Sequence, residues 1–500
     1  SLLSEIPCAL CAMGLLRNVY CALYLQLLLC ANVYMRDHPV TRQVVEAAFS
    51  IHYSHLPEVT RAKIRNLIID GMGVLIEGLG HHNVAIVVNH LREVGGKSTS
   101  YLPGHDYATS VPDAAFVHGI AIHVMDFEPM FDPPTHVVSP VLGALVALMM
   151  CDSESSCARR DPQGELFLKA FTAGIELQAD LRTAALVADN DARVHENFFP
   201  FQKQGFHPPG TVGVMGAALA ASIWLGLTVD QASMALGMAA SRAGGIAGNI
   251  GTMTKAAHSG NAARAGVECA MLARKGFTAS ARTLEEPGGW GDVFGGDFFD
   301  RKQLIDGMQS LRCFTSPGFA FKHWPAHTAM QVSIHAALPL HTPGEPFAGQ
   351  VHIESPVFKY CDRPNPTSTD ECRFSIQFNV VQAIIDGKVT PESFSDAQLN
   401  RPEIQQLLAN TRLEMKHDIP ADFTKMEVHV KLSDGRTSSS DRWPGHWKLP
   451  ATRHQIEQKF VHCASYMFEP EIARDLFNCL GGDEHQIDLL KVTTLLRNHA

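Results

Sequence analysis

Apolar residues that recur every three or four positions predict helices along the first half of the chain. Four stretches are rich in Ala, Leu and Val without alternation, as expected for closely packed helices: 114–124, 138–150, 167–187 and 211–227. Thr228 and Gln231 form a capping-box pattern at the start of another helix, which runs through Ala239. A helix over 57–79 is indicated by an apolar face that consists of Val59, Ile64, Leu67, Ile68, Met72, Leu75 and Ile76.

The pattern changes between about residues 278 and 444, where prolines become frequent. Two regions there are typical of strands: 351–360, and 426–432 followed by an Asp434-Gly435 turn and a second strand from Arg436 onward. After Pro450 the helical pattern returns. We therefore expect a helical domain, 40–278, that is completed by 445–500 after a mixed domain, 279–444, and that is preceded by an apolar extension, 1–39, of open role.

Length and composition favour two globular domains, because 500 residues exceed the usual size of one hydrophobic core. The net charge of -10, without a run of Lys and Arg, argues against a nucleic-acid binder. Twelve scattered cysteines favour a reducing compartment, so we expect an intracellular protein, cytoplasmic or mitochondrial. The apolar residues 7–35 leave three interpretations open: a signal anchor in contact with a membrane, a targeting segment and a packing helix.

Two polar segments that adjoin predicted helices contain candidate catalytic residues. In residues 125–136, a stiff loop of acids and prolines, Asp126 is placed to fix the tautomer of His136 and raise its basicity. An acidic capping loop with a solvated histidine explains the same pattern. In residues 202–210, Lys203 and His207 precede a helix whose N-terminus would attract an anion, and the alternative is a loop whose prolines begin that helix.

Two further segments combine lysine with histidine. Lys255 and His258 are three residues apart among small residues, so a helix would place them on one face, although a glycine-rich packing segment with a surface lysine fits as well. Residues 321–327 bring Lys322 and His327 close to Trp324 along the chain. The glycines do not form a phosphate loop or a dinucleotide fingerprint, because neither GxxxxGK[ST] nor GxGxxG occurs.

These four segments, in this order, resemble the MmgE/PrpD family. The similar stretches within 40–498 are Ala114-Ala115-Phe116-Val117, Met125-Asp126-Phe127, Phe206-His207-Pro208-Pro209, Thr254-Lys255, Gly260-Asn261-Ala262, Pro325-Ala326-His327, Asn400-Arg401-Pro402 and Gly445-His446-Trp447. The family includes 2-methylcitrate and alkylcitrate dehydratases and cis-aconitate decarboxylases. The resemblance implies a mainly α fold, with a large all-helical domain and a smaller α+β lid domain, in a homodimer whose active site lies between the two domains.

The resemblance also implies a lyase that acts on a small tricarboxylic acid. It assigns site roles to Asp126, His136, His207, Lys255 and Tyr360. We expect acid–base chemistry from Asp126, His136, His207 and His258, and substrate contacts from Lys203, Lys255, Lys322, His327, Met130 and Tyr360.

Met130 stands where the family's decarboxylases have a site threonine, which makes the site more apolar. This change favours dehydration of an alkylcitrate or 2-methylcitrate over decarboxylation of cis-aconitate to itaconate. A non-catalytic relative that binds a small acid is the alternative of another class. No cofactor or metal is expected, because the four segments contain no cysteine for an iron–sulfur cluster, and the CxxC of Cys8 and Cys11 lacks a histidine or a second CxxC.

Overall fold

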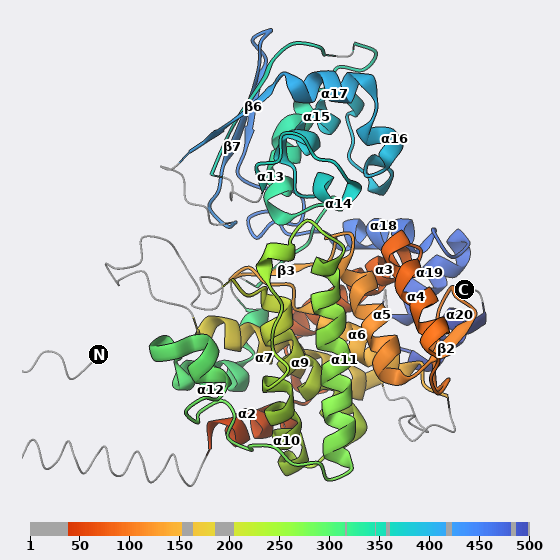
Figure 1. Cartoon of the computed structure of the whole chain (residues 1–500), viewed down its shortest axis with the longest axis vertical. Helices are drawn as coiled ribbons and strands as arrows, with labels where there is room; N and C mark the ends of the chain where they lie inside the picture. The colour runs from red at the N-terminus through yellow and green to blue at the C-terminus, as the bar shows by residue number, and fades with distance from the viewer. Residues whose placement is uncertain are drawn as a thin grey trace, which may run out of the picture.

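The computed structural model describes residues 39–152, 164–185, 205–315, 318–345, 347–356, 361–416, 423–481 and 487–498. The apolar extension up to residue 38, Lys203 and Tyr360 lie outside these residues. Figure 1 shows a large helical body with a smaller lid above it. The mainly α fold expected from the resemblance is confirmed.

The body is built from helices that the apolar periodicity predicted, together with several that it did not. These are α2 (Val40–Phe49), α3 (Glu58–Leu79), α4 (His82–Val94), α5 (Val111–His123), α6 (Val138–Met149), α7 (Gly164–Ala184), α9 (Pro208–Leu225), α10 (Val229–Ala240), α11 (Thr254–Arg274) and α12 (Arg301–Ser310). The chain returns to the body in α18 (Arg453–Ala464), α19 (Pro470–Cys479) and α20 (Leu489–Asn498), and a short hairpin joins β1 (Ser100–Leu102) to β2 (Tyr107–Thr109). The capping box predicted at Thr228 and Gln231 is present at the start of α10.

Helix α9 runs through the centre of the body. It is long and apolar enough to cross a membrane, yet 94% of its apolar window is buried among the other helices, as in the core of a folded domain. Its ends follow the sequence: Pro208 and Pro209 occupy the first turn, and Gly226 closes the C-terminus in the left-handed conformation, with φ 69°. His207 is thereby held immediately before the first turn of a rigid, buried helix.

Glycines allow α5, α6 and α11 to pack at unusually short range. A Cβ added to Gly260 of α11 would lie 2.6 Å from the carbonyl oxygen of Phe116 in α5. One added to Gly143 of α6 would lie 2.8 Å from the backbone nitrogen of Gly119 in α5. Because these helices touch through their backbones, the N-terminal turn of α11 lies against the loop that leaves α5.

The lid contains a four-stranded sheet in the order β6-β5-β7-β8. Its elements are β5 (Val351–Ser355), β6 (Thr411–Met415), β7 (Val428–Leu432) and β8 (Thr437–Ser440), with helices α13 (Thr328–Ala337), α14 (Thr369–Cys372), α15 (Ile376–Asp386), α16 (Asp396–Leu399) and α17 (Pro402–Ala409). Strand β5 pairs in parallel with β6 and antiparallel with β7, and the predicted hairpin is confirmed by the antiparallel pairing of β7 with β8. Alternate residues of β5 are buried, so one face of the sheet packs on α13 and α15.

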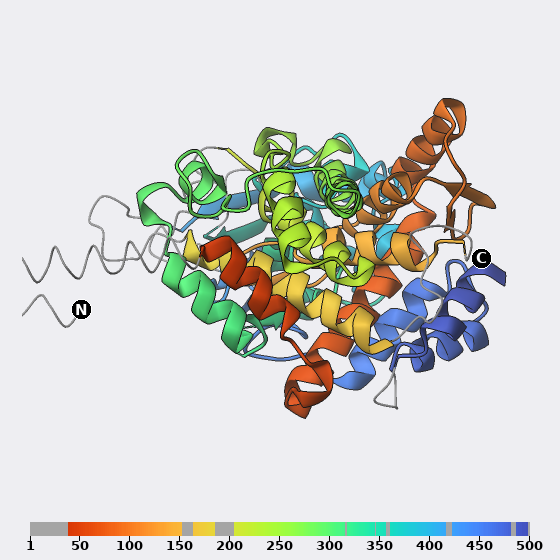
Figure 2. The same cartoon turned by 90° about the horizontal axis from the view of Figure 1, so that it is seen from below.

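The hydrophobic core of the body extends well beyond residue 278, where the sequence pattern placed the change of domain. Leu284, Trp290 and Phe314 are buried in it, and α12 lies alongside α2 and α7 (Figure 2). The second core, that of the lid, begins with Ala320 and also includes Met130. The irregular segment after α11 thus packs its large apolar side chains against the body.

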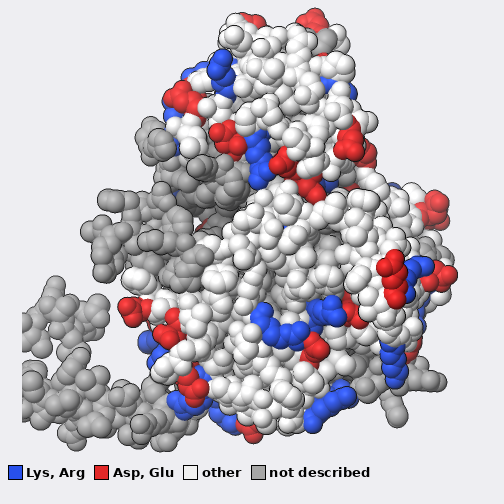
Figure 3. All heavy atoms as spheres, in the orientation of Figure 1, with Lys and Arg blue, Asp and Glu red and all other residues white. Residues whose placement is uncertain are grey.

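A short sheet connects the two parts. β3 (Met130–Phe131), from the loop between α5 and α6, pairs with β4 (Phe319–Ala320), which leads directly to Lys322. On the described part of the face shown in Figure 3, Lys and Arg are interspersed with Asp and Glu and form no continuous basic band. A cluster of buried charged side chains, described below, lies in the interior where the body meets the lid.

Candidate active site

The loop from α5 to α6 brings the first carboxylate into the interior. Asp126 is 1% exposed and has a positive φ of 53°, a conformation that few residues other than glycine adopt and that Asp tolerates better than most. Its backbone nitrogen donates to the carbonyl of His123 at the end of α5. Strained backbone of this kind persists where the surrounding structure holds it, which is common at functional sites.

Two lysines from distant segments bind Asp126. Lys255, in the first turn of α11, donates to Oδ2, and Lys322, just after β4, donates to Oδ1 and, at 2.8 Å, to the Asp126 carbonyl. Burial would raise the pKa of Asp126, but the two ammonium groups hold that pKa well below its usual value. Burial lowers the pKa of Lys322 to about 8, although Asp126 opposes the change.

Three predicted histidines lie around this ion cluster. His136 Nε2 is 3.6 Å from Asp126 Oδ1, longer than a hydrogen bond, so Asp126 is held by the lysines rather than by His136. His207 and His258 contact each other through their Nδ1 atoms at 3.0 Å. Burial, reinforced by nearby lysine charge, lowers the pKa of all three histidines, and they are neutral imidazoles at neutral pH.

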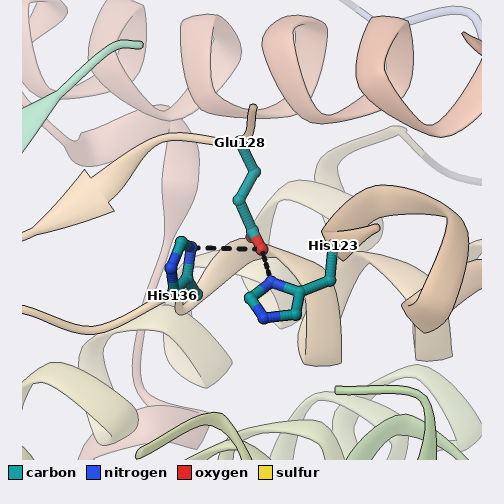
Figure 4. A group of neighbouring side chains, drawn as sticks. All are labelled: His123, Glu128 and His136. Carbon is teal, nitrogen blue, oxygen red and sulfur yellow. Dashed lines mark hydrogen bonds and ion pairs between the residues drawn. The ribbon is translucent and has the colours of Figure 1, made fainter. Parts of the chain in front are cut away.

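Glu128 and His123, to which the sequence analysis gave no role, lie next to His136, with the Glu128 carboxyl group directed at both rings (Figure 4). Glu128 Oε1 is 2.5 Å from His123 Nδ1 and 3.4 Å from His136 Nδ1. Ser139 donates its backbone N–H to Oε2 and its hydroxyl to Oε1, both at 2.8 Å. Burial raises the pKa of Glu128 to about 8, against the lowering effect of the Ser139 hydrogen bonds, so this carboxyl group carries a proton at neutral pH.

The ligand atoms of His123, Glu128 and His136 lie within 4.8 Å of one another, so a metal has to be considered. Donor atoms on one tetrahedral zinc are separated by about 3.3 Å, given zinc–nitrogen distances near 2.0 Å. The 2.5 Å contact between His123 and Glu128 is too short for two ligands of one ion and suits a shared proton. The positive charges of Lys255 and Lys322 nearby also disfavour a cation.

The remaining predicted residues have different surroundings. His327 caps α13 by accepting from the backbone N–H of Ala329, and burial lowers its pKa to about 3. Met130 is buried in the hydrophobic core of the lid and is not among the residues that line the cleft described below. Its predicted contact with substrate stays a prediction, as do those of Lys203 and Tyr360, which lie outside the described residues.

A narrow cleft of about 10 Å³ reaches the ion cluster from outside. Asp126, Lys255 and Thr252 line it on the body side, and Arg373 and Phe374 on the lid side. Arg373, which the sequence analysis did not select, is 4% exposed and donates to the carbonyls of Pro325 and Met125 at 2.6 and 3.4 Å. The site is therefore formed jointly by the body and the lid, and it combines excess positive charge with neutral imidazoles.

Comparison with known proteins covers almost the whole described chain. The family model of the MmgE/PrpD N-terminal domain matches residues 42–301, and that of the MmgE/PrpD C-terminal domain matches residues 324–480. The chain is similar to cis-aconitate decarboxylase of Homo sapiens, 30% identical over 472 residues that cover 92% of this chain and 94% of that protein. It is equally similar to the cis-aconitate decarboxylase of Mus musculus, with 30% identity over 92% of this chain and 93% of that protein. A cis-aconitate decarboxylase-like protein of Aspergillus oryzae is 21% identical over 487 residues, which cover 91% of this chain and 97% of that protein.

Proposed function

The chain belongs to the MmgE/PrpD family, and we propose that it is a lyase that decarboxylates cis-aconitate or a closely related tricarboxylate. The observation that carries this proposal is the buried Asp126, held between Lys255 and Lys322, beside an imidazole of His136 that is neutral at neutral pH. The relatives named as cis-aconitate decarboxylases support a lyase of this type.

The charges of the cluster suit a polyanionic substrate. Asp126 is ionised and neutralises one of the two lysines, while the neighbouring histidines and Glu128 are uncharged at neutral pH. One positive charge is left over in a desolvated site, where a carboxylate gains far more from it than it would in water. Lys255, which lines the cleft, is the lysine placed to receive a substrate carboxylate.

The histidines supply the proton that decarboxylation requires. When the bond to the departing carboxyl group breaks, carbon dioxide leaves. The electron pair of that bond remains on the substrate. An ammonium group that binds the remaining carboxylates stabilises this charge, and a nearby N–H must then protonate the carbon. His136 is suited to that role because its Nε2 atom faces the Asp126 side of the site.

A second candidate reaction is the dehydration of an alkylcitrate or 2-methylcitrate. The replacement of a site threonine by Met130, which the resemblance to the family implies, favours it. That preference loses weight because Met130 packs in the lid core, where an apolar side chain is needed for packing irrespective of substrate. The same lysines and histidines would serve either reaction. A homodimer also remains part of the proposal.

Incubation of the purified protein with cis-aconitate and, separately, with 2-methylcitrate tests the proposal. Mass spectrometry should detect itaconate and carbon dioxide from the first acid. If only 2-methylcitrate reacts, by losing water, the proposed activity is dehydration instead of decarboxylation. If neither acid reacts while binding is measured for both, the chain is a binding protein, the alternative class. His136→Ala, as a matched inactive control, should form no product above the background.

A further inference from the structure

The two ring nitrogens of His136 face two carboxyl groups that differ in charge. Nε2 faces Asp126, which is ionised and held by lysines. Nδ1 faces Glu128 at 3.4 Å, and at that distance this buried nitrogen makes no hydrogen bond within the described structure. Among the described residues, Nδ1 of His136 is therefore a free hydrogen-bond acceptor that lies next to the carboxyl group of Glu128.

Glu128 is enclosed by groups that favour its holding one proton. His123 of α5 contacts Oε1, and Ser139 of α6 binds both oxygens and connects through its hydroxyl to Ser259 of α11 at 3.0 Å. Lys322 and Lys255 are the charged groups that act on it, and they lower its pKa less than burial raises it. The side chain is fully buried, so a proton on Glu128 can move only to a neighbouring side chain.

We propose that Glu128 acts as an acid towards His136. Glu128 passes its proton to Nδ1 of His136 while Nε2 of the same ring delivers a proton to the substrate carbon. This inference rests on the proposed function for the identity of the reaction. A neutral imidazole is a very weak acid by itself. It becomes an effective donor when its other nitrogen gains a proton in the same step, so a neutral histidine needs an acid behind it.

The transfer is balanced in atoms and electrons. The Nε2–H bond of His136 breaks as a C–H bond forms with the electron pair left by carbon dioxide. The O–H bond of Glu128 breaks as the Nδ1–H bond forms. His136 ends as the other neutral tautomer, and Glu128 ends as a carboxylate that the N–H and hydroxyl of Ser139 stabilise. The negative charge has thereby moved from the substrate to a prepared acceptor.

Further imidazoles lie beside the pair of Glu128 and His136. The ring centroid of His123 lies 4.5 Å from that of His136 and 5.7 Å from that of His207. His207 in turn contacts His258, which at 7% is the most exposed of these four histidines. One proton per turnover must return to Glu128, and His123, whose Nδ1 contacts Glu128 Oε1 at 2.5 Å, is the neighbour placed to deliver it.

The matched test is Glu128→Gln, which keeps the shape of the side chain and an oxygen acceptor for Ser139 but has no acidic proton to transfer. We expect kcat to fall about 100-fold or more with KM little changed, since general acid catalysis contributes at least that factor. Rates in mixtures of H2O and D2O separate this role from a purely structural one. The wild type should show a curved dependence, as two protons move together, and Glu128→Gln a linear one.

Glu128→Asp is the companion variant, because it retains the titratable proton and should recover part of kcat together with the curved dependence. A wild-type kcat and curvature in Glu128→Gln would overturn the inference. So would stoichiometric zinc in the purified protein that is lost in Glu128→Gln.

Infrared spectroscopy of the substrate-free protein keeps this test separate from the choice of reaction. At pH 7 the wild type should show the carbonyl band of a protonated, buried carboxyl group that Glu128→Gln lacks, and the band should fade as the pH passes about 8. If this band is absent, the inference fails even when the enzyme decarboxylates cis-aconitate. If the band is present and neither acid reacts, the proposed function fails while the protonated Glu128 stands.

Discussion

Replacing Asp126 by Asn should destabilise the fold through the two buried lysines that it leaves behind. The substitution preserves size but removes the negative charge between Lys255 and Lys322. Breaking a buried ion pair costs about 3–5 kcal/mol. Lys322 contributes only a small part of this loss of stability, because it can release its proton when Asp126 is replaced. Its pKa is about 8, one unit above pH 7, so neutralising it costs no more than about 1.4 kcal/mol. Most of the loss must then come from Lys255.

Urea denaturation of the wild type and Asp126→Asn at pH 7 and pH 9 measures this effect. The deficit should be about 3–5 kcal/mol at pH 7 and should narrow by up to about 1.4 kcal/mol at pH 9, where Lys322 is already neutral in the wild type. Asp230→Asn is the control, because Asp230 pairs with Arg42 at the surface with its side chain 76% exposed, and it should change the stability by less than about 1 kcal/mol. A deficit for Asp126→Asn as small as that of the control would refute the reasoning.

Three further predictions test the packing, the titration and the chemistry. Gly260→Ala should lower the free energy of unfolding by about 1–3 kcal/mol, measured in urea, because the added Cβ meets the backbone oxygen of Phe116. Burial raises the pKa of Glu176 to about 7, so the folded state holds its proton more tightly and stability should fall as the pH rises from 4.5 to about 7; Glu176→Gln should flatten this slope in melting temperatures recorded across that range. His136→Ala should lower kcat on cis-aconitate about 100-fold or more in a steady-state assay, and a near-normal kcat would remove His136 from the mechanism.

Many helices and strands could be predicted, because apolar spacing and turn residues depend only on neighbouring positions in the chain. Apolar spacing is sufficient to place α3 and α9, and the Asp434-Gly435 pair is sufficient to place the hairpin of β7 and β8. The end of the body core is different. Trp290 and Phe314 lie in irregular segments without periodicity, so only their tertiary packing shows that they belong to the body.

The site was accessible from the sequence only in part. Asp126 and Lys255 stand in distinctive segments, but the contact between them joins positions 129 residues apart, which no spacing rule can predict. Glu128 was visible as one of three acids in the loop, yet its role depends on burial and on the nearness of His123, at the end of a mostly apolar helix. Met130 shows a different limit: packing in the lid core accounts for an apolar side chain as well as substrate contact does, so its contact with substrate stays a prediction.

The most direct test of the central claim is turnover of cis-aconitate in D2O by the wild-type protein, followed by mass spectrometry of the product and the released gas. The account predicts carbon dioxide and an equal amount of a dicarboxylic acid that carries one carbon-bound deuterium, with His136→Ala forming neither. Cis-aconitate that is recovered unchanged from an intact, folded wild type would contradict it.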